Sequence, residues 1–356
     1  MTDQAPAGAK TPIPVGVLYD FPQHDGGASF EEALRLGIET VASGDRLDRD
    51  VKLVPSHAQG LPAGSAYDVE KKFSELVDIG ALAVVGPSIS DNGLVVRDLA
   101  DSACIPCINY TGGERTRSEW MFHYQVGSLE EEPEVLVDHL CTRGFGSASL
   151  AYDHSPVGRR YAEVFTEASA RAGIDILASA AVSPLAQDLS STVSRLQSAR
   201  PDCLAYLGLG VAARALAVVV HRAGWNIPVV ANSSLMFGYT RRDWRADWEG
   251  WTYVDTVADD NVQRSRLRDL SRRAAAGPVG VAAFDIGRLL AEALVRTEHL
   301  TRAGVRDALE RVKRMPAASG TAGTTMGFGA WDHGALKGPY LVLRRWQNEK
   351  TVQVPL

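Results

Sequence analysis

An uninterrupted apolar strand passes directly into a helix start in the segment Ala81-Leu-Ala-Val-Val-Gly-Pro-Ser-Ile-Ser-Asp-Asn92. Residues 81–85 carry no polar side chain. A strand that is apolar on both faces is typical of a parallel sheet covered by helices on both sides. The segment therefore predicts one strand-to-helix step of an α/β fold.

The same step repeats along most of the chain. Short strands alternate with helical patterns in which apolar residues recur every three or four positions. This alternation predicts a doubly wound α/β pattern that occurs twice. The predicted strands are 14–19, 51–55, 81–85, 104–109, 147–152, 174–182, 203–207, 227–231 and 340–346, and the predicted helices are 29–41, 69–77, 93–102, 131–143, 158–172, 188–199, 211–223, 262–276, 280–297 and 302–313.

The first helix begins with a sequence typical of a capping box. In Ser29-Phe-Glu-Glu32, the Ser29 hydroxyl and the Glu32 carboxylate are expected to accept hydrogen bonds from free backbone N–H groups. We therefore predict that the helix starts at Ser29.

Length and charge exclude several classes of protein. The chain has 356 residues, enough for two domains of about 150 residues, and 45% of them are apolar. Its 37 Lys and Arg against 43 Asp and Glu give a net charge of −6, without the basic face that nucleic acid requires. The apolar runs are far shorter than the roughly 20 residues of a membrane span. We expect no nucleic-acid partner and no membrane insertion.

Motifs for catalysis, metals and cofactors are weak. No two of the eight histidines lie within five residues of each other, and the chain has neither a GxSxG nor a GxxxxGK[ST] motif. The sequence predicts no enzyme, no metal and no cofactor. Cys104 and Cys107 form a CxxC motif, which we interpret as two small apolar strand residues, with a redox or metal role as the alternative.

One glycine-rich turn leaves a second alternative open. Gly208-Leu-Gly210-Val-Ala-Ala213 follows a strand and opens a helix, as a dinucleotide fingerprint does. The next strand, however, ends Val230-Ala-Asn232, without the acid that would bind the ribose. We therefore favour a tight turn beneath a cleft, and an NAD-dependent oxidoreductase is the alternative.

Polar side chains gather where two neighbouring strands end. Ser88, Ser90 and Asn92 follow one strand, and the segment from Asn109 through Tyr110, Thr111 and Gly112 follows the next. Ligands of parallel sheets bind at the carboxyl ends of strands, and a helix start favours anionic or carbonyl groups. We predict that Ser90 and Thr111 bind a carboxylate or carbonyl group of a ligand.

The order of several motifs resembles that of the type I periplasmic binding proteins, in their branched-chain amino-acid and amide binding branch. The resemblance covers about residues 12–350. The motifs are Ile13-Pro-Val-Gly-Val-Leu18, Gly37-Ile-Glu39, Ala83-Val-Val-Gly-Pro-Ser-Ile-Ser90, Ile105-Pro-Cys-Ile-Asn109, Ala151-Tyr-Asp153 before Val157-Gly158, Asp202-Cys-Leu-Ala-Tyr-Leu-Gly208, and Ala223-Gly224 before Ile227-Pro228.

This resemblance implies two Rossmann-like lobes that clamp a ligand and are joined by three hinge crossovers, near 125–128, 253–257 and 327–331. Lobe one would hold 12–126 and 256–328, lobe two 127–255 and 329–356, and 1–11 would be a disordered tail. The implied ligand-binding residues are Ser88, Ile89, Ser90, Asn92, Tyr110, Thr111 and Gly112 from lobe one, Tyr152, His154, Val157, Leu209, Asn232 and Ser233 from lobe two, and His24 at the cleft edge.

Two functions are compatible with the resemblance. The first is a non-enzymatic solute receptor that delivers a small molecule to an ABC-type permease. The second is a cytoplasmic ligand sensor that regulates a partner protein. No secretory signal is visible in Met1–Lys10, so we expect a cytoplasmic protein, or a periplasmic one if a signal has been removed.

Departures from the family pattern predict the kind of ligand. Amino-acid binding members place a carboxylate where this chain has Asn232 and Ser233, and a tyrosine where it has Val157. An ammonium group buried without a partner charge is costly. We therefore expect a carboxylate or amide with an apolar or aromatic body. An α-amino acid is disfavoured unless Asp153, Asp25 or Asp255 supplies the missing charge.

Overall fold

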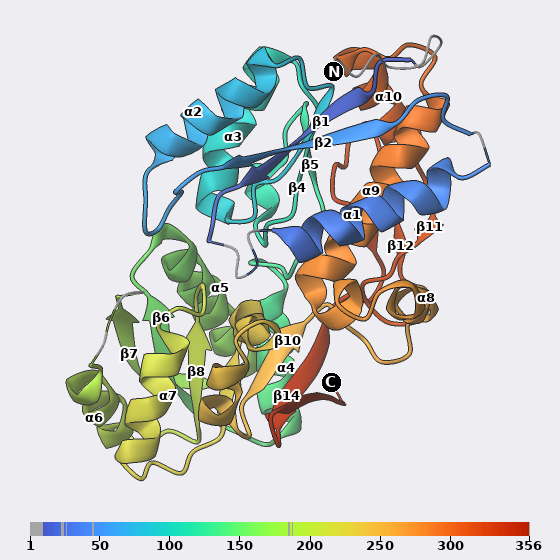
Figure 1. The fold of residues 1–356 in the computed structure, drawn as a ribbon. Coiled ribbons are helices and arrows are strands. Elements are labelled where there is room, and N and C mark those ends of the chain that lie inside the picture. Colours follow the sequence, from blue (N-terminus) through green and yellow to red (C-terminus); the bar gives the residue numbers. More distant parts are fainter. Residues whose placement is uncertain are drawn as a thin grey trace.

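Two sheets, one parallel and one mainly parallel, are each covered by helices and form two lobes that lie one above the other in Figure 1. The computed structural model describes residues 10–22, 25, 27–44, 46–183, 186 and 188–355. The chain passes from the upper lobe to the lower and back before it ends in the lower lobe. The predicted α/β fold of two doubly wound lobes is confirmed.

The first lobe contains a parallel sheet with the strand order β2-β1-β3-β4-β5. Its strands β3 and β4 are buried along their whole length, as the apolar run 83–85 predicts for β3. The elements from the first part of the chain are β1 (Ile13–Tyr19), α1 (Ala28–Ala42), β2 (Val51–His57), α2 (Ala66–Asp78), β3 (Ala83–Val85), α3 (Ser90–Ala103), β4 (Cys107–Asn109), η1 (Glu114–Thr116) and β5 (Met121–His123).

The second lobe repeats this order and extends it. Its sheet has the order β7-β6-β8-β9-β10-β14-β15, in which β14 and β15 are antiparallel additions. The elements are α4 (Glu132–Thr142), β6 (Ser147–Asp153), α5 (Pro156–Ala172), β7 (Asp175–Val182), α6 (Ser190–Ser198), β8 (Cys203–Leu207), α7 (Ala213–Arg222), β9 (Val229–Ala231), η2 (Ser233–Tyr239), η3 (Arg242–Trp248), β10 (Thr252–Asp255), β14 (Val342–Gln347) and β15 (Lys350–Val354).

The chain returns to the first lobe after β10. There α9 packs lengthwise on α1 (Figure 1), and the chain adds a small sheet with the strand order β11-β12-β13. The returning elements are α8 (Val262–Leu270), η4 (Ala274–Ala276), α9 (Pro278–Arg296), α10 (Arg302–Arg311), β11 (Met315–Pro316), β12 (Thr325–Met326) and β13 (Leu336–Lys337).

Three connections join the lobes. They run from β5 to α4, from β10 to α8 and from β13 to β14. The third connection therefore comes later than the predicted 327–331. The reason is that residues 333–335 pair with β5: the His123 N–H donates to the His333 carbonyl at 2.8 Å, and the Ala335 N–H donates to the His123 carbonyl at 2.8 Å.

Asp25, and not the predicted capping box, caps α1. Its carboxylate accepts hydrogen bonds from the N–H groups of Gly27 at 3.1 Å and Ser29 at 2.8 Å. The Glu32 carboxylate instead binds the Ser271 hydroxyl at 2.6 Å and the Arg273 guanidinium. The predicted capping box is wrong because tertiary partners compete successfully for Glu32.

Candidate functional site

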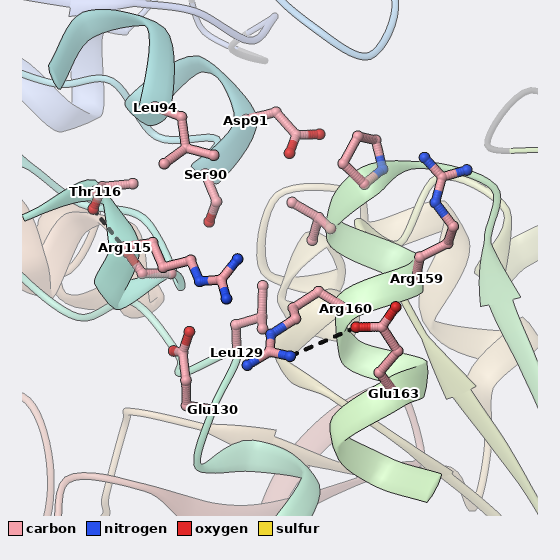
Figure 2. Close-up of a pocket in the computed structure, with 13 residues that line it drawn as sticks. Ser90, Asp91, Leu94, Arg115, Thr116, Leu129, Glu130, Arg159, Arg160 and Glu163 are labelled. Carbon is pink, nitrogen blue, oxygen red and sulfur yellow. Dashed lines mark hydrogen bonds and ion pairs between the residues drawn. The ribbon is translucent and has the colours of Figure 1, made fainter. Parts of the chain in front are cut away.

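A pocket of about 280 Å³ lies between the two lobes. One wall comes from the first turn of α3 and from η1, and the facing wall comes from the first turns of α5 (Figure 2). Residues 129 and 130, in the first connection, form its floor. The lining residues are Ser90, Asp91, Leu94, Gly113, Arg115, Thr116, Leu129, Glu130, Pro156, Val157, Arg159, Arg160 and Glu163.

Ser90 and Val157 are the two predicted site residues that line this pocket. Within the described residues, the Ser90 hydroxyl makes no hydrogen bond, and in Figure 2 it points into the pocket. A Cβ on Gly113 would lie 3.1 Å from the Ser90 Oγ, so the glycine keeps this hydroxyl accessible. Ser90 can therefore donate to an acceptor that enters between the lobes.

A carboxylate of the protein itself occupies the position predicted for the anionic ligand group beside Ser88 and Asn92. Asp20, directly after β1, is fully buried. It accepts hydrogen bonds from the Ser88 N–H and hydroxyl, both at 2.7 Å, from the Ile89 N–H at 2.9 Å and from the Asn92 amide at 2.8 Å. Burial raises the pKa of this carboxyl. Ser88, Ile89 and Asn92 thus hold the β1 and β3 loops together.

The segment after β4 is also held internally. The Thr111 hydroxyl is fully buried and donates to the Asn109 side-chain oxygen at 2.9 Å. Tyr110 is buried and stacks on Phe30, with 4.8 Å between ring centroids. The Gly112 carbonyl accepts from the N–H of Leu129 at 2.7 Å, which fixes the first connection against lobe one. The Thr111 hydroxyl is therefore engaged within lobe one, and Thr111 does not line the pocket.

In lobe two, Asp153 organises the glycine-rich turn. Its buried carboxylate accepts from the Tyr206 hydroxyl and from the Leu209 N–H, both at 2.6 Å, and burial raises its pKa to about 6. A Cβ on Gly208 would lie 2.2 Å from the Asp153 Cγ. Gly208 therefore permits a tight turn around this carboxylate, as the favoured interpretation expects, and His154 is exposed and does not pair with Asp153.

A buried carboxylate from the first residue of α4 lies beside Ser233. Glu132 is fully buried and accepts from the Ser233 N–H at 2.5 Å, the Ser233 hydroxyl at 3.0 Å, the Ser128 N–H at 2.6 Å and the Tyr161 hydroxyl at 3.1 Å. Glu132 is therefore an acid beside Ser233 that the sequence did not indicate, and these donors already engage its carboxylate. Burial raises the pKa of Glu132 to about 7.

The remaining predicted site residues that the structure describes do not line this pocket. Asn232 is bonded to both backbone groups of Gly208, with 2.9 Å to its carbonyl and 3.2 Å to its N–H. Tyr152 and Leu209 are half-buried against the larger core. Asp255 accepts from the Tyr239 hydroxyl at 2.7 Å, so it is already engaged. His24 lies outside the described residues.

The sequence analysis did not identify the charged residues of the pocket. Asp91 on α3 faces α5, where its carboxylate lies near the Val157 N–H and the charge of Arg159. Arg160 and Glu163 follow one helical turn later on α5, with 3.6 Å between their charged atoms. The three-residue spacing of 157, 160 and 163 could have placed these side chains on one helix face.

The described residues contain no group of three or more His, Cys, Asp or Glu able to hold a metal ion. Among them, no helix is both long and apolar enough to cross a membrane. Cys104 and Cys107 are both free thiols, but only Cys107 is a buried strand residue. Cys104 ends α3 in an exposed left-handed conformation, with a φ of 49°, so its interpretation as a strand residue is wrong.

Comparison with known proteins identifies the family to which this chain belongs. A family model described as periplasmic binding protein matches residues 12–347. The chain belongs to the periplasmic binding protein family. A search of curated proteins gives no match.

Solved structures share the fold of this periplasmic binding protein at low sequence identity. A leucine-binding protein from Thermotoga maritima has a TM-score of 0.82 at 13% identity, with 96% of this chain and 98% of that chain covered. A branched-chain amino acid transporter substrate-binding protein from Streptococcus pneumoniae, in complex with isoleucine, has a TM-score of 0.83 at 14% identity, with 97% and 100% covered. An ABC transporter substrate-binding protein from Desulfitobacterium hafniense, in complex with leucine, has a TM-score of 0.77 at 17% identity, with 97% and 100% covered.

Proposed function

We propose that the protein is a non-enzymatic receptor that closes its two lobes on a small organic carboxylate with an apolar body. The main support for this proposal is the pocket between the lobes, because its two facing walls belong to different lobes. A solute that contacts both walls stabilises the closed arrangement by its binding free energy. The three connections near β5, β10 and β13 would act as the hinge.

The chemistry of the pocket supports this class of ligand. Leu94, Leu129 and Val157 supply apolar surface, while Ser90 supplies a free hydroxyl. A pocket of about 280 Å³ is close to the lower end of the range for small-molecule sites. A short aliphatic or aromatic acid therefore matches it in both size and polarity.

An α-amino acid is the second candidate, and one observation favours it. The carboxylates of Asp91 and Glu130 line the same pocket, so an ammonium group would not lack a partner charge. Two of the similar structures also hold leucine or isoleucine.

We also propose delivery to an ABC-type permease and a location outside the cytoplasm. The family match and the transporter-associated proteins of the same fold support both. The cytoplasmic sensor and the NAD-dependent enzyme have no such support.

Calorimetric titration with a matched pair of solutes tests the proposal. Leucine and 4-methylpentanoate differ only by the ammonium group, so their relative affinities separate the two candidates. We expect one molecule bound per chain, and Ser90→Ala should weaken binding tenfold to about a hundredfold, the effect of losing a hydrogen bond to a charged group.

Ser102→Ala is the matched control, because Ser102 is exposed at the far end of the same helix. It should bind as the wild type does. Equal affinity of the Ser90→Ala variant and the wild type would contradict the position of the site.

A further inference from the structure

Two arginines from opposite lobes extend into the pocket. Arg115 belongs to η1 of lobe one, and Arg160 belongs to α5 of lobe two. In Figure 2 their guanidinium groups and the Ser90 hydroxyl point toward the same space. Three hydrogen-bonding side chains from three elements therefore converge where the lobes meet.

The two arginines differ in how far neighbouring carboxylates compensate their charges. Within the described part of the chain, the Arg115 guanidinium has no ion pair or hydrogen bond. Arg160 has the Glu163 carboxylate at 3.6 Å and also lies near the charge of Glu130, but its Nε is buried without a hydrogen-bond partner. The third arginine, Arg159, differs because it lies near the buried carboxylate of Asp91.

We propose that Arg115 and Arg160, with Ser90, form an anion-binding subsite that holds the carboxylate of the ligand and joins the two lobes through it. This inference rests on the proposed function and adds the part of the ligand that is recognised. Like charges on opposite lobes repel each other when the lobes approach. An anion between them replaces that repulsion with two charge-assisted contacts, so closure depends on the charge of the ligand.

A set of carboxylates and their amides tests the subsite by thermal unfolding. The probes are 4-methylpentanoate, 3-phenylpropanoate and leucine, each beside its amide. Each carboxylate should stabilise the wild type more than its amide does, and Arg115→Gln and Arg160→Gln should each weaken carboxylate binding tenfold to about a hundredfold. Arg171→Gln is the control, because Arg171 is exposed at the other end of α5, and it should retain the preference.

The outcomes separate the two proposals. If amides stabilise the wild type as well as carboxylates do, or if both glutamine variants keep the preference, the anion subsite is overturned and the receptor function stands. If none of the probes stabilises the wild type, the proposed function itself is contradicted.

A charge reversal tests the subsite without a ligand. Arg115→Glu places a carboxylate opposite Arg160, so it should lower the radius of gyration in small-angle scattering with no solute present. Arg115→Gln and the double variant Arg115→Glu, Arg160→Glu should not lower it. An unchanged radius in the Arg115→Glu variant would overturn the inference.

Discussion

Buried carboxylates organise the loops at the carboxyl ends of the strands. Asp20, Asp153 and Glu132 are each fully buried, and each accepts hydrogen bonds from loop residues of other elements. Burying a carboxylate is costly unless several donors compensate for the lost water. The donors that compensate here include Ser88, Asn92 and Ser233, which are therefore structural.

Glu132 gives the clearest prediction at the scale of a single residue. Its pKa is about 7 in the folded protein, against an ordinary value of 4.5, because burial disfavours the charged form. The folded state therefore holds this proton more tightly than the unfolded chain. The stabilisation is complete below about pH 4.5 and is lost as the pH rises to about 7, which lowers the free energy of unfolding by up to about 3 kcal/mol.

Urea unfolding of the wild type and Glu132→Gln at pH 5, 6, 7 and 8 measures this effect. Glutamine keeps a side-chain carbonyl but does not titrate, so its stability should fall less with rising pH. The other buried carboxyls, such as Asp153, are present in both proteins, so their contributions cancel in the difference. Parallel pH profiles would show that Glu132 does not titrate in this range.

At the scale of elements, close helix packing depends on two glycines. A Cβ on Gly37 of α1 would lie 2.1 Å from the Phe284 carbonyl oxygen of α9. A Cβ on Gly287 of α9 would lie 2.3 Å from the Leu34 carbonyl oxygen of α1. The two backbones therefore approach each other more closely than any larger residue allows.

Gly37→Ala should lower the free energy of unfolding by about 1–3 kcal/mol, because the helices must separate to admit the methyl group. Chemical denaturation measures this difference. Gly146→Ala is the control, since its Cβ would meet nothing closer than 3.8 Å, and it should be neutral or slightly stabilising. A Gly37→Ala variant as stable as the wild type would mean that α1 and α9 are packed less tightly.

The long elements could be predicted from the sequence, but the short ones could not. Apolar periodicity located α1, α5 and α9 to within a few residues, because each buries one face over several turns. The strands β5 and β11–β13 have two or three residues each, too few to show a period. They form because neighbouring strands already present free backbone groups. The position of those neighbours is set by the fold and cannot be read from the short segments themselves.

At the scale of the whole molecule, the position of the cleft was predictable but the groups that face it were not. The strand ends indicated Ser90 and the family resemblance implied Val157, and both residues line the pocket. The sequence did not indicate that Asp20 and Glu132 would engage the other polar residues, because both acids lie far along the chain from their partners. Arg115 and Arg160 likewise become neighbours only when the lobes meet.

Closure of the lobes can be measured with the native cysteines. Cys104 ends α3 in lobe one and Cys141 lies near the end of α4 in lobe two, and both are exposed, whereas Cys107 and Cys203 are buried. Burial raises the pKa of both buried thiols, which slows their labelling. Nitroxide labels on Cys104 and Cys141 therefore report the distance between the lobes without any substitution.

Double electron–electron resonance on this labelled protein should be recorded without solute and with saturating 4-methylpentanoate or leucine, whichever calorimetry shows to bind one molecule per chain. We predict that the distance distribution shifts to a single new maximum when the solute binds, because the lobes rotate about the three connections. A distribution that stays unchanged while one solute molecule is bound per chain would contradict lobe closure.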